Sequence, residues 1–83
     1  MTTLLITESG SRYELEADTR RIRRVEGTHA PTSRQGRDGE WKPFTSVSTP
    51  QVGEALVVVW RIREGGVAEC LITSPVAFVD TVS

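Results

Sequence analysis

The longest apolar stretch of the chain, residues 55–62, reads Ala-Leu-Val-Val-Val-Trp-Arg-Ile and contains no glycine or proline. Three consecutive valines favour a β-strand, because branched side chains fit a pleated surface and crowd a helix. Both faces of this strand are apolar, one formed by the even-numbered residues 56–62 and the other by Ala55, Val57 and Val59. Such a strand is either covered on both sides or uses one face for contact with another molecule. Because so short a chain cannot easily cover both faces, we expect Val57 and Val59 to form an apolar contact face.

Residues 12–18 alternate strictly between polar and apolar side chains, with Tyr13, Leu15 and Ala17 on one face. This alternation predicts a half-buried strand. The segment Ser-Arg-Tyr-Glu at residues 11–14 also matches a helix capping box. We favour the strand, because on a helical wheel Tyr13 and Ala17 lie far from Leu15 and the apolar residues that follow.

The remaining apolar segments also predict short strands. In residues 2–7, Leu4 and Ile6 share one face. In residues 20–26, Ile22 and Val25 are out of step, which indicates a bulge near residues 23–24. Further strands are expected at three segments: an edge segment interrupted by a proline at residues 40–47, and strands at residues 67–73 and 76–82, separated by Ser74-Pro75.

Six to seven short strands without a predicted helix indicate an all-β fold, either a small open, SH3-like barrel or a compact β-sandwich. With 83 residues, the chain is expected to form a single β domain over residues 1–83. Residues 27–39 show no apolar period and predict a flexible loop. Loops of this length are typically functional or disordered.

The chain lacks the residue sets of common catalytic and metal sites, so we expect no enzyme, no metal and no cofactor. Its only histidine, His29, lies in the predicted loop, and its only cysteine, Cys70, is interpreted as a small core residue of the strand at 67–73. Glu14 and Glu16 share a strand face, but paired carboxylates that act on a substrate need a deep cleft. We interpret the two glutamates as a solvated strand face.

The formal net charge of −1 gives no global reason for nucleic-acid or membrane binding. No apolar stretch is long enough to span a bilayer, and the N-terminal residues lack a signal-peptide pattern. We therefore expect a cytoplasmic protein that does not bind a membrane.

Basic residues gather in the middle of the chain, where they alternate with aromatic side chains. The members of this set are Arg20, Arg21, Arg23, Arg24, Trp41, Lys42 and Phe44. Arginines and aromatic side chains on a β surface are typical of proteins that bind single-stranded nucleic acid. Glu14, Glu16 and Asp18 on the neighbouring strand, however, can pair with the arginines and leave the face neutral.

Three segments together resemble small uncharacterised β proteins of actinobacterial phages and their hosts. They are Thr-Glu-Ser-Gly-Ser-Arg-Tyr-Glu-Leu at residues 7–15, the arginine-rich segment after it, and Thr-Ser-Pro-Val at residues 73–76. The strong preference for arginine over lysine is compatible with such a GC-rich genome. The resemblance implies a phage accessory or virion-associated role, in the host cytoplasm or the virion, and self-assembly. It assigns no catalytic or binding residue.

From these patterns we expect a non-enzymatic interaction module that associates with itself or with a protein partner. Val57 and Val59 would supply the apolar contact, and Arg34 and Arg37 in the loop would supply a charged rim with donor groups for carboxylates. The alternative is a nucleic-acid-binding barrel that uses the basic and aromatic set. The two differ in salt dependence, because phosphate binding weakens steeply with salt and an apolar interface does not.

Overall fold

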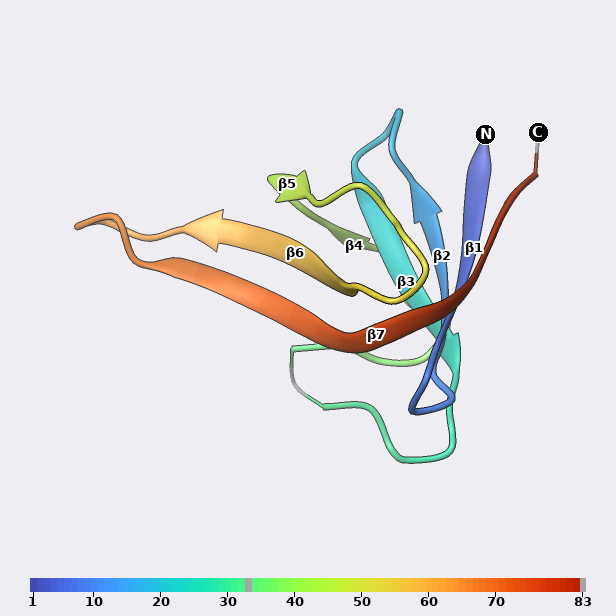
Figure 1. Cartoon of the computed structure of the whole chain (residues 1–83). Coiled ribbons are helices and arrows are strands. Elements are labelled where there is room, and N and C mark those ends of the chain that lie inside the picture. The colour runs from blue at the N-terminus through green and yellow to red at the C-terminus, as the bar shows by residue number, and fades with distance from the viewer. Residues whose placement is uncertain (33, 83) are drawn as a thin grey trace.

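The computed structural model describes residues 1–32 and 34–82, and every regular element in this part of the chain is a β-strand. The strands are β1 (Thr2–Thr7), β2 (Arg12–Glu16), β3 (Arg21–Glu26), β4 (Lys42–Pro43), β5 (Ser46–Val47), β6 (Ala55–Ile62) and β7 (Ala68–Val82). They form one antiparallel sheet in the order β4-β3-β2-β1-β7-β6-β5, which curls into a half-barrel (Figure 1). The predicted all-β open barrel is confirmed. Within these described residues there is no helix with the length and apolar character to cross a membrane.

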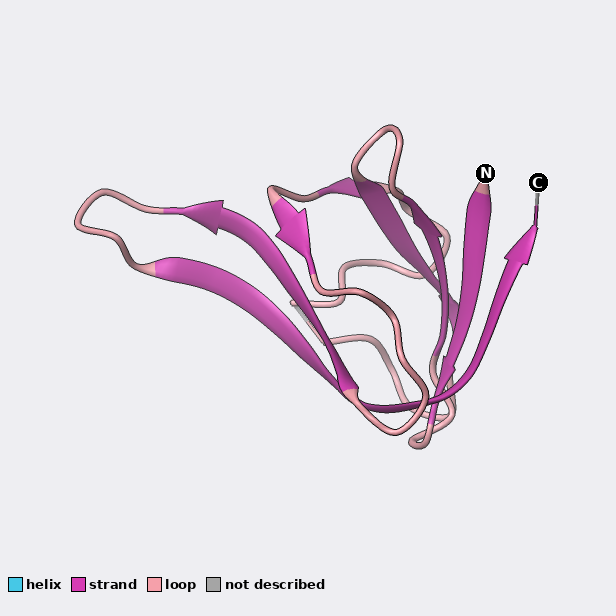
Figure 2. Cartoon of the chain, turned by 45° about the horizontal axis from the view of Figure 1, so that its top comes forward, coloured by secondary structure: helices cyan, strands magenta, loops and turns pink. Residues whose placement is uncertain are grey.

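Strand β7 is one continuous element of 15 residues, where two separate strands were predicted. Its first half pairs with β6 and its second half with β1. Pro75 lies at the change of partner, opposite Ala55, and its carbonyl accepts a hydrogen bond of 2.8 Å from the amide of Glu8. A proline has no amide to donate, so a strand tolerates it where the ladder is interrupted. The strand therefore bends at this point instead of ending, and the sheet forms two arms that meet there (Figure 2).

The short strands β4 and β5 belong to one extended segment that joins the two ends of the sheet. Next to β4, the amide of Phe44 donates to the carbonyl of Arg20 at 2.9 Å. One residue later, the amide of Thr45 donates to the carbonyl of Val59 in β6 at 2.8 Å. The proline-interrupted edge segment expected at residues 40–47 is confirmed, and it holds the arms of the half-barrel together.

The core lies on the inner side of the curled sheet. Ten buried apolar side chains fill it: Leu5, Tyr13, Leu15, Ile22, Phe44, Leu56, Val58, Trp60, Leu71 and Val76. In β6 the alternation follows the sequence-based prediction, because the even face is buried up to Trp60 while Val57 and Val59 point outward and are half-buried. In β1, Leu4 and Ile6 do share a face, but it is the outer one.

Two sequence-based predictions are corrected by the register. Cys70 lies on the outer face of β7 and is not a core residue, because its neighbour Leu71 takes the inward position. The bulge in β3 occurs at Val25, between the pairs Arg12–Glu26 and Tyr13–Arg24, one residue beyond the predicted place. Because the bulge comes after Arg24, the alternation from Ile22 is unbroken and Arg24 points inward, like Ile22.

Candidate functional site

Four apolar residues form a patch on the outer side of the β6–β7 hairpin. The register places Val57 opposite Ile72 and Val59 opposite Cys70, and facing residues of an antiparallel pair project to the same side. Ile72 is 68% exposed, and the other three side chains are half-buried. We call these four residues the hairpin face. Clustered exposed apolar side chains of this kind mark contact surfaces.

The hairpin that carries this face projects away from the rest of the molecule (Figure 1). Its turn contains Gly65 and Gly66 at φ +88° and +82°, values that favour glycine. Beside the turn, Arg61 and Arg63 both pair with Glu69, and the Nε of Arg61 lies 2.6 Å from Oε2 of that carboxylate. The hydrogen bond from Arg61 lowers the pKa of Glu69. With Glu64 in the turn, the two arginines and the two glutamates leave the tip of the hairpin charged but without net charge.

Of the two arginines predicted to form a rim, the structure brings one to the hairpin face. Nη1 of Arg34 donates a hydrogen bond of 3.0 Å to the carbonyl oxygen of Cys70. Arg37 is exposed elsewhere and lines a separate surface hollow together with Trp41 and Lys42.

The loop at residues 27–39 is anchored to the sheet by polar contacts. Arg24, which is 1% exposed, pairs with Asp38 at 2.6 Å and donates from Nη2 to the carbonyl of His29 at 2.5 Å. Tyr13 accepts a hydrogen bond of 2.7 Å at its hydroxyl from Nε2 of Gln35. Burial raises the pKa of Tyr13. Arg24 therefore holds the loop from inside and is not available at the surface.

The outer arginines of β3 are largely neutralised. Arg21 pairs with Glu16 at 2.6 Å, and Nε of Arg23 donates to Oε1 of Glu14 at 2.6 Å. Their guanidinium carbons lie 4.4 and 4.6 Å from the centroid of the Trp41 ring, so each makes a cation–π contact as well. The predicted cross-strand pairing is confirmed for both glutamates.

Other members of the basic and aromatic set are distributed over different surroundings. Phe44 is buried in the core, and the Nζ of Lys42 lies over the ring of Trp60 at 4.2 Å from its centroid. Arg20 is exposed in the turn before β3 with a φ of 52°. Asp18, the third acid considered as a partner, lies in the same turn at 3.9 Å from the N-terminal amine. The structure therefore removes two members of the set, Phe44 and Arg24, from any surface for nucleic acid.

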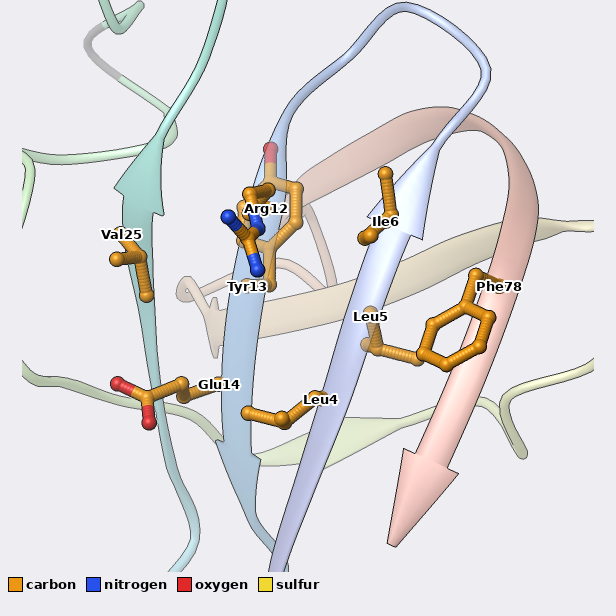
Figure 3. A pocket seen from close by; sticks show the side chains of 8 residues that line it. All are labelled: Leu4, Leu5, Ile6, Arg12, Tyr13, Glu14, Val25 and Phe78. Carbon is orange, nitrogen blue, oxygen red and sulfur yellow. The ribbon is translucent and has the colours of Figure 1, made fainter.

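A second outer feature is a hollow of about 290 Å³ over β1, β2, β3 and β7 (Figure 3). Phe78 lies opposite Ile6 in the register and is 48% exposed. The hollow is lined by apolar side chains, two of them from the core, and by two charged ones: Leu4, Leu5, Ile6, Tyr13, Val25, Phe78, Arg12 and Glu14. Sequence reasoning missed this hollow because its residues come from four strands that only the register brings together.

Residues 1–32 and 34–82 contain no group of three or more His, Cys, Asp or Glu side chains placed to hold a metal ion. No protein-family model, no curated protein and no solved structure matches this chain.

Proposed function

We propose that this protein is a non-enzymatic interaction module that self-associates through the hairpin face. The observation that carries the proposal is the exposure of Ile72 directly opposite Val57, on a hairpin that projects from the body of the molecule. A single exposed isoleucine is common on protein surfaces. Here it belongs to a continuous apolar patch, which is costly to leave in water and is a typical feature of contact surfaces.

The surroundings of the patch support a protein interface. Arg34 lies at its border through the hydrogen bond to Cys70, and the ion pairs of Arg61 and Arg63 with Glu69 lie toward the tip. An apolar centre with a polar, charged rim is the usual composition of protein interfaces. The phage accessory or virion-associated setting implied by the resemblance is part of this proposal.

The nucleic-acid alternative has weaker support from the same geometry. Arg21 and Arg23 are paired with glutamates, and Arg24 and Phe44 are buried. Paired arginines release fewer counterions on phosphate binding, so the electrostatic contribution to affinity is small.

The proposal is tested by measuring the solution mass with light-scattering chromatography at low and high salt. We expect a dimer or larger assembly whose mass does not change with salt. Ile72→Glu should convert it to a monomer, because the charge would be buried in the interface. Phe78→Glu makes the same change on the other exposed outer surface and should leave the mass unchanged.

A monomer at both salts and at the highest soluble concentration would exclude self-association. In that case, salt-sensitive binding of labelled single-stranded DNA or RNA would favour the alternative function.

A further inference from the structure

In the part of the chain that the structure describes, no strand lies next to the edge of β7 beside the hairpin face. Residues 68–74 pair with β6 alone, because the pairing of β1 with β7 begins only at Val76. At the near end, the turn after β1 covers this edge, where the amide of Ser9 donates to Oγ of Ser74 at 3.2 Å. The edge of β7 is therefore open between the hairpin tip and Ser74.

The hydrogen bonds of β6 show which backbone groups of β7 point to the open edge. On the side away from β7, the carbonyl of Val57 accepts from the amide of Ser48 at 2.9 Å, and that of Val59 accepts from the amide of Thr45 at 2.8 Å. In an antiparallel strand, the amide and the carbonyl of any one residue point to the same side of the strand. Val57 and Val59 therefore form non-hydrogen-bonded pairs with β7.

The residues that face these two valines must direct their own polar groups away from β6. They are Ile72 and Cys70. The hydrogen bond from Arg34 to the carbonyl of Cys70 agrees with this direction, because Arg34 approaches from the open edge. Within residues 1–32 and 34–82, it is the only side chain that donates to either residue. Among the described residues, nothing pairs with the Cys70 amide or with either polar group of Ile72, so these groups can pair with another strand.

We propose that a second copy of this chain pairs with this edge, so that two β7 strands run antiparallel about a two-fold axis at Leu71. In this register Cys70 of one copy faces Ile72 of the other, and every edge-directed amide and carbonyl of the two residues finds a partner. With the axis at Cys70 instead, Ile72 would pair with Ala68 and the two Cys70 residues would face each other. The inference rests on the proposed function, because it specifies how the self-association occurs.

A second copy fits this edge better than a charged or irregular partner. An isologous contact requires a self-complementary surface, and once Arg34 releases the carbonyl of Cys70 the edge offers two donors and two acceptors. Residues 70–74 (Cys-Leu-Ile-Thr-Ser) contain no charge and no proline, the devices that usually protect an exposed edge from pairing. The same pairing places the two hairpin faces side by side on one continuous sheet, so that Cys70 and Ile72 of the two copies contact each other across it.

The proposed register is tested by disulfide cross-linking of the full chain that carries the substitution Ile72→Cys. The Cα atoms of facing, hydrogen-bonded residues lie about 5.5 Å apart, which suits a disulfide. Under mild oxidation the introduced thiol should bond to Cys70 of the second copy, and non-reducing electrophoresis should show a covalent dimer. In the unmodified chain the two Cys70 residues lie diagonally, about 7–8 Å apart, and should not cross-link. Ile72→Cys combined with Cys70→Ser should likewise remain uncross-linked.

The contribution of backbone hydrogen bonds to dimer affinity is tested by comparing Ile72→Pro with Ile72→Val. The two introduced side chains are similar in size. Proline removes the amide that points to the open edge and leaves the ladder with β6 intact. We expect the dimer dissociation constant of the proline variant to exceed that of the valine variant by about tenfold or more, since each copy loses one hydrogen bond. Circular dichroism checks that both variants are folded.

The outcomes separate the two proposals. If light scattering shows a dimer but no specific cross-link forms and proline has the same effect as valine, the edge pairing is excluded and self-association stands. If the unmodified chain is a monomer at every concentration, both proposals fall.

Discussion

Nη1 of Arg24 lies 2.6 Å from Oδ1 of Asp38, with the arginine side chain 1% exposed and the carboxylate 39% exposed. Arg24 belongs to β3 and Asp38 to the loop at residues 27–39, so this ion pair fastens the loop to the sheet. The guanidinium also donates to the carbonyl of His29. A charged residue at a core position is therefore compensated by groups of the loop that covers it.

Asp38→Ala should destabilise the protein by about 2 kcal/mol. Removing one member of a buried pair costs about 3–5 kcal/mol, and the exposure of Asp38 reduces this value because solvent screens the pair. Urea denaturation would measure the change. Arg24→Met together with Asp38→Ala should recover part of the loss, since no buried charge then remains, and Asp80→Ala at an exposed acid should have almost no effect. Equal stabilities of Asp38→Ala and Asp80→Ala would contradict the conclusion that the ion pair of Arg24 with Asp38 stabilises the fold.

Gly27→Ala should also destabilise the protein, by about 1–3 kcal/mol, as overpacking does. A Cβ atom at residue 27 would lie 1.9 Å from Nη2 and 2.7 Å from Cζ of Arg24. The guanidinium cannot move away freely, because Asp38 and His29 hold it. The matched control is the same substitution in an Arg24→Ala background, where its cost should nearly vanish. A cost that persists there would show that the close approach to Arg24 is not the cause.

Ultraviolet titration should show that Tyr13 ionises at higher pH in the folded protein than in denaturant. Burial raises the pKa of Tyr13 above its ordinary value of about 10, and it is the only tyrosine of the chain, so the tyrosinate signal is specific. Because the raised pKa favours the protonated folded state, the associated stability is complete below pH ~10 and is lost as pH rises through the folded pKa. Tyr13→Phe should remove this alkaline loss. An identical titration curve in folded and unfolded protein would argue against burial of the hydroxyl.

Glu14→Gln combined with Glu16→Gln should increase affinity for single-stranded DNA, in a salt-dependent manner. The two substitutions release Arg21 and Arg23 from their ion pairs beside Trp41 and create an uncompensated basic surface with an aromatic ring. Fluorescence anisotropy at several salt concentrations would measure the effect.

The matched control for this experiment is Glu54→Gln combined with Glu64→Gln, which changes the net charge equally on the other arm of the sheet. It should leave DNA binding near that of the unmodified chain. An equal gain in both double variants would show that only net charge matters.

Arg34→Ala should strengthen self-association by about thirtyfold, because it frees the carbonyl of Cys70 in each copy for the other strand. Breaking that hydrogen bond otherwise costs about 1 kcal/mol in each copy at the moment of pairing. Sedimentation equilibrium would measure the dimer constant, with Arg37→Ala as a control for the loss of one positive charge from the same loop. Weaker association of the Arg34 variant would instead show that this side chain contributes to the interface.

Strands with a local signal could be predicted from the amino-acid sequence alone. Residues 55–62 could be predicted as a strand with Val57 and Val59 on the outer face, because β-branched side chains and strict alternation act within a few residues. The cross-strand pairs of Glu14 and Glu16 with the arginines of β3 were equally accessible, because a short hairpin leaves little choice of register.

Features that depend on register and on contacts between distant segments could not be predicted from the sequence and became visible only in the folded chain. The bulge at Val25 comes after Arg24, so unbroken alternation from Ile22 places Arg24 on the inner side, and a bend at Pro75 joins the two predicted strands into one. Register and long-range contacts also determine the outward position of Cys70, the hollow beside Phe78 and the open edge of β7. A side chain in a strand changes face with a shift of one residue, so local alternation cannot settle positions that lie beyond a bulge or a change of partner.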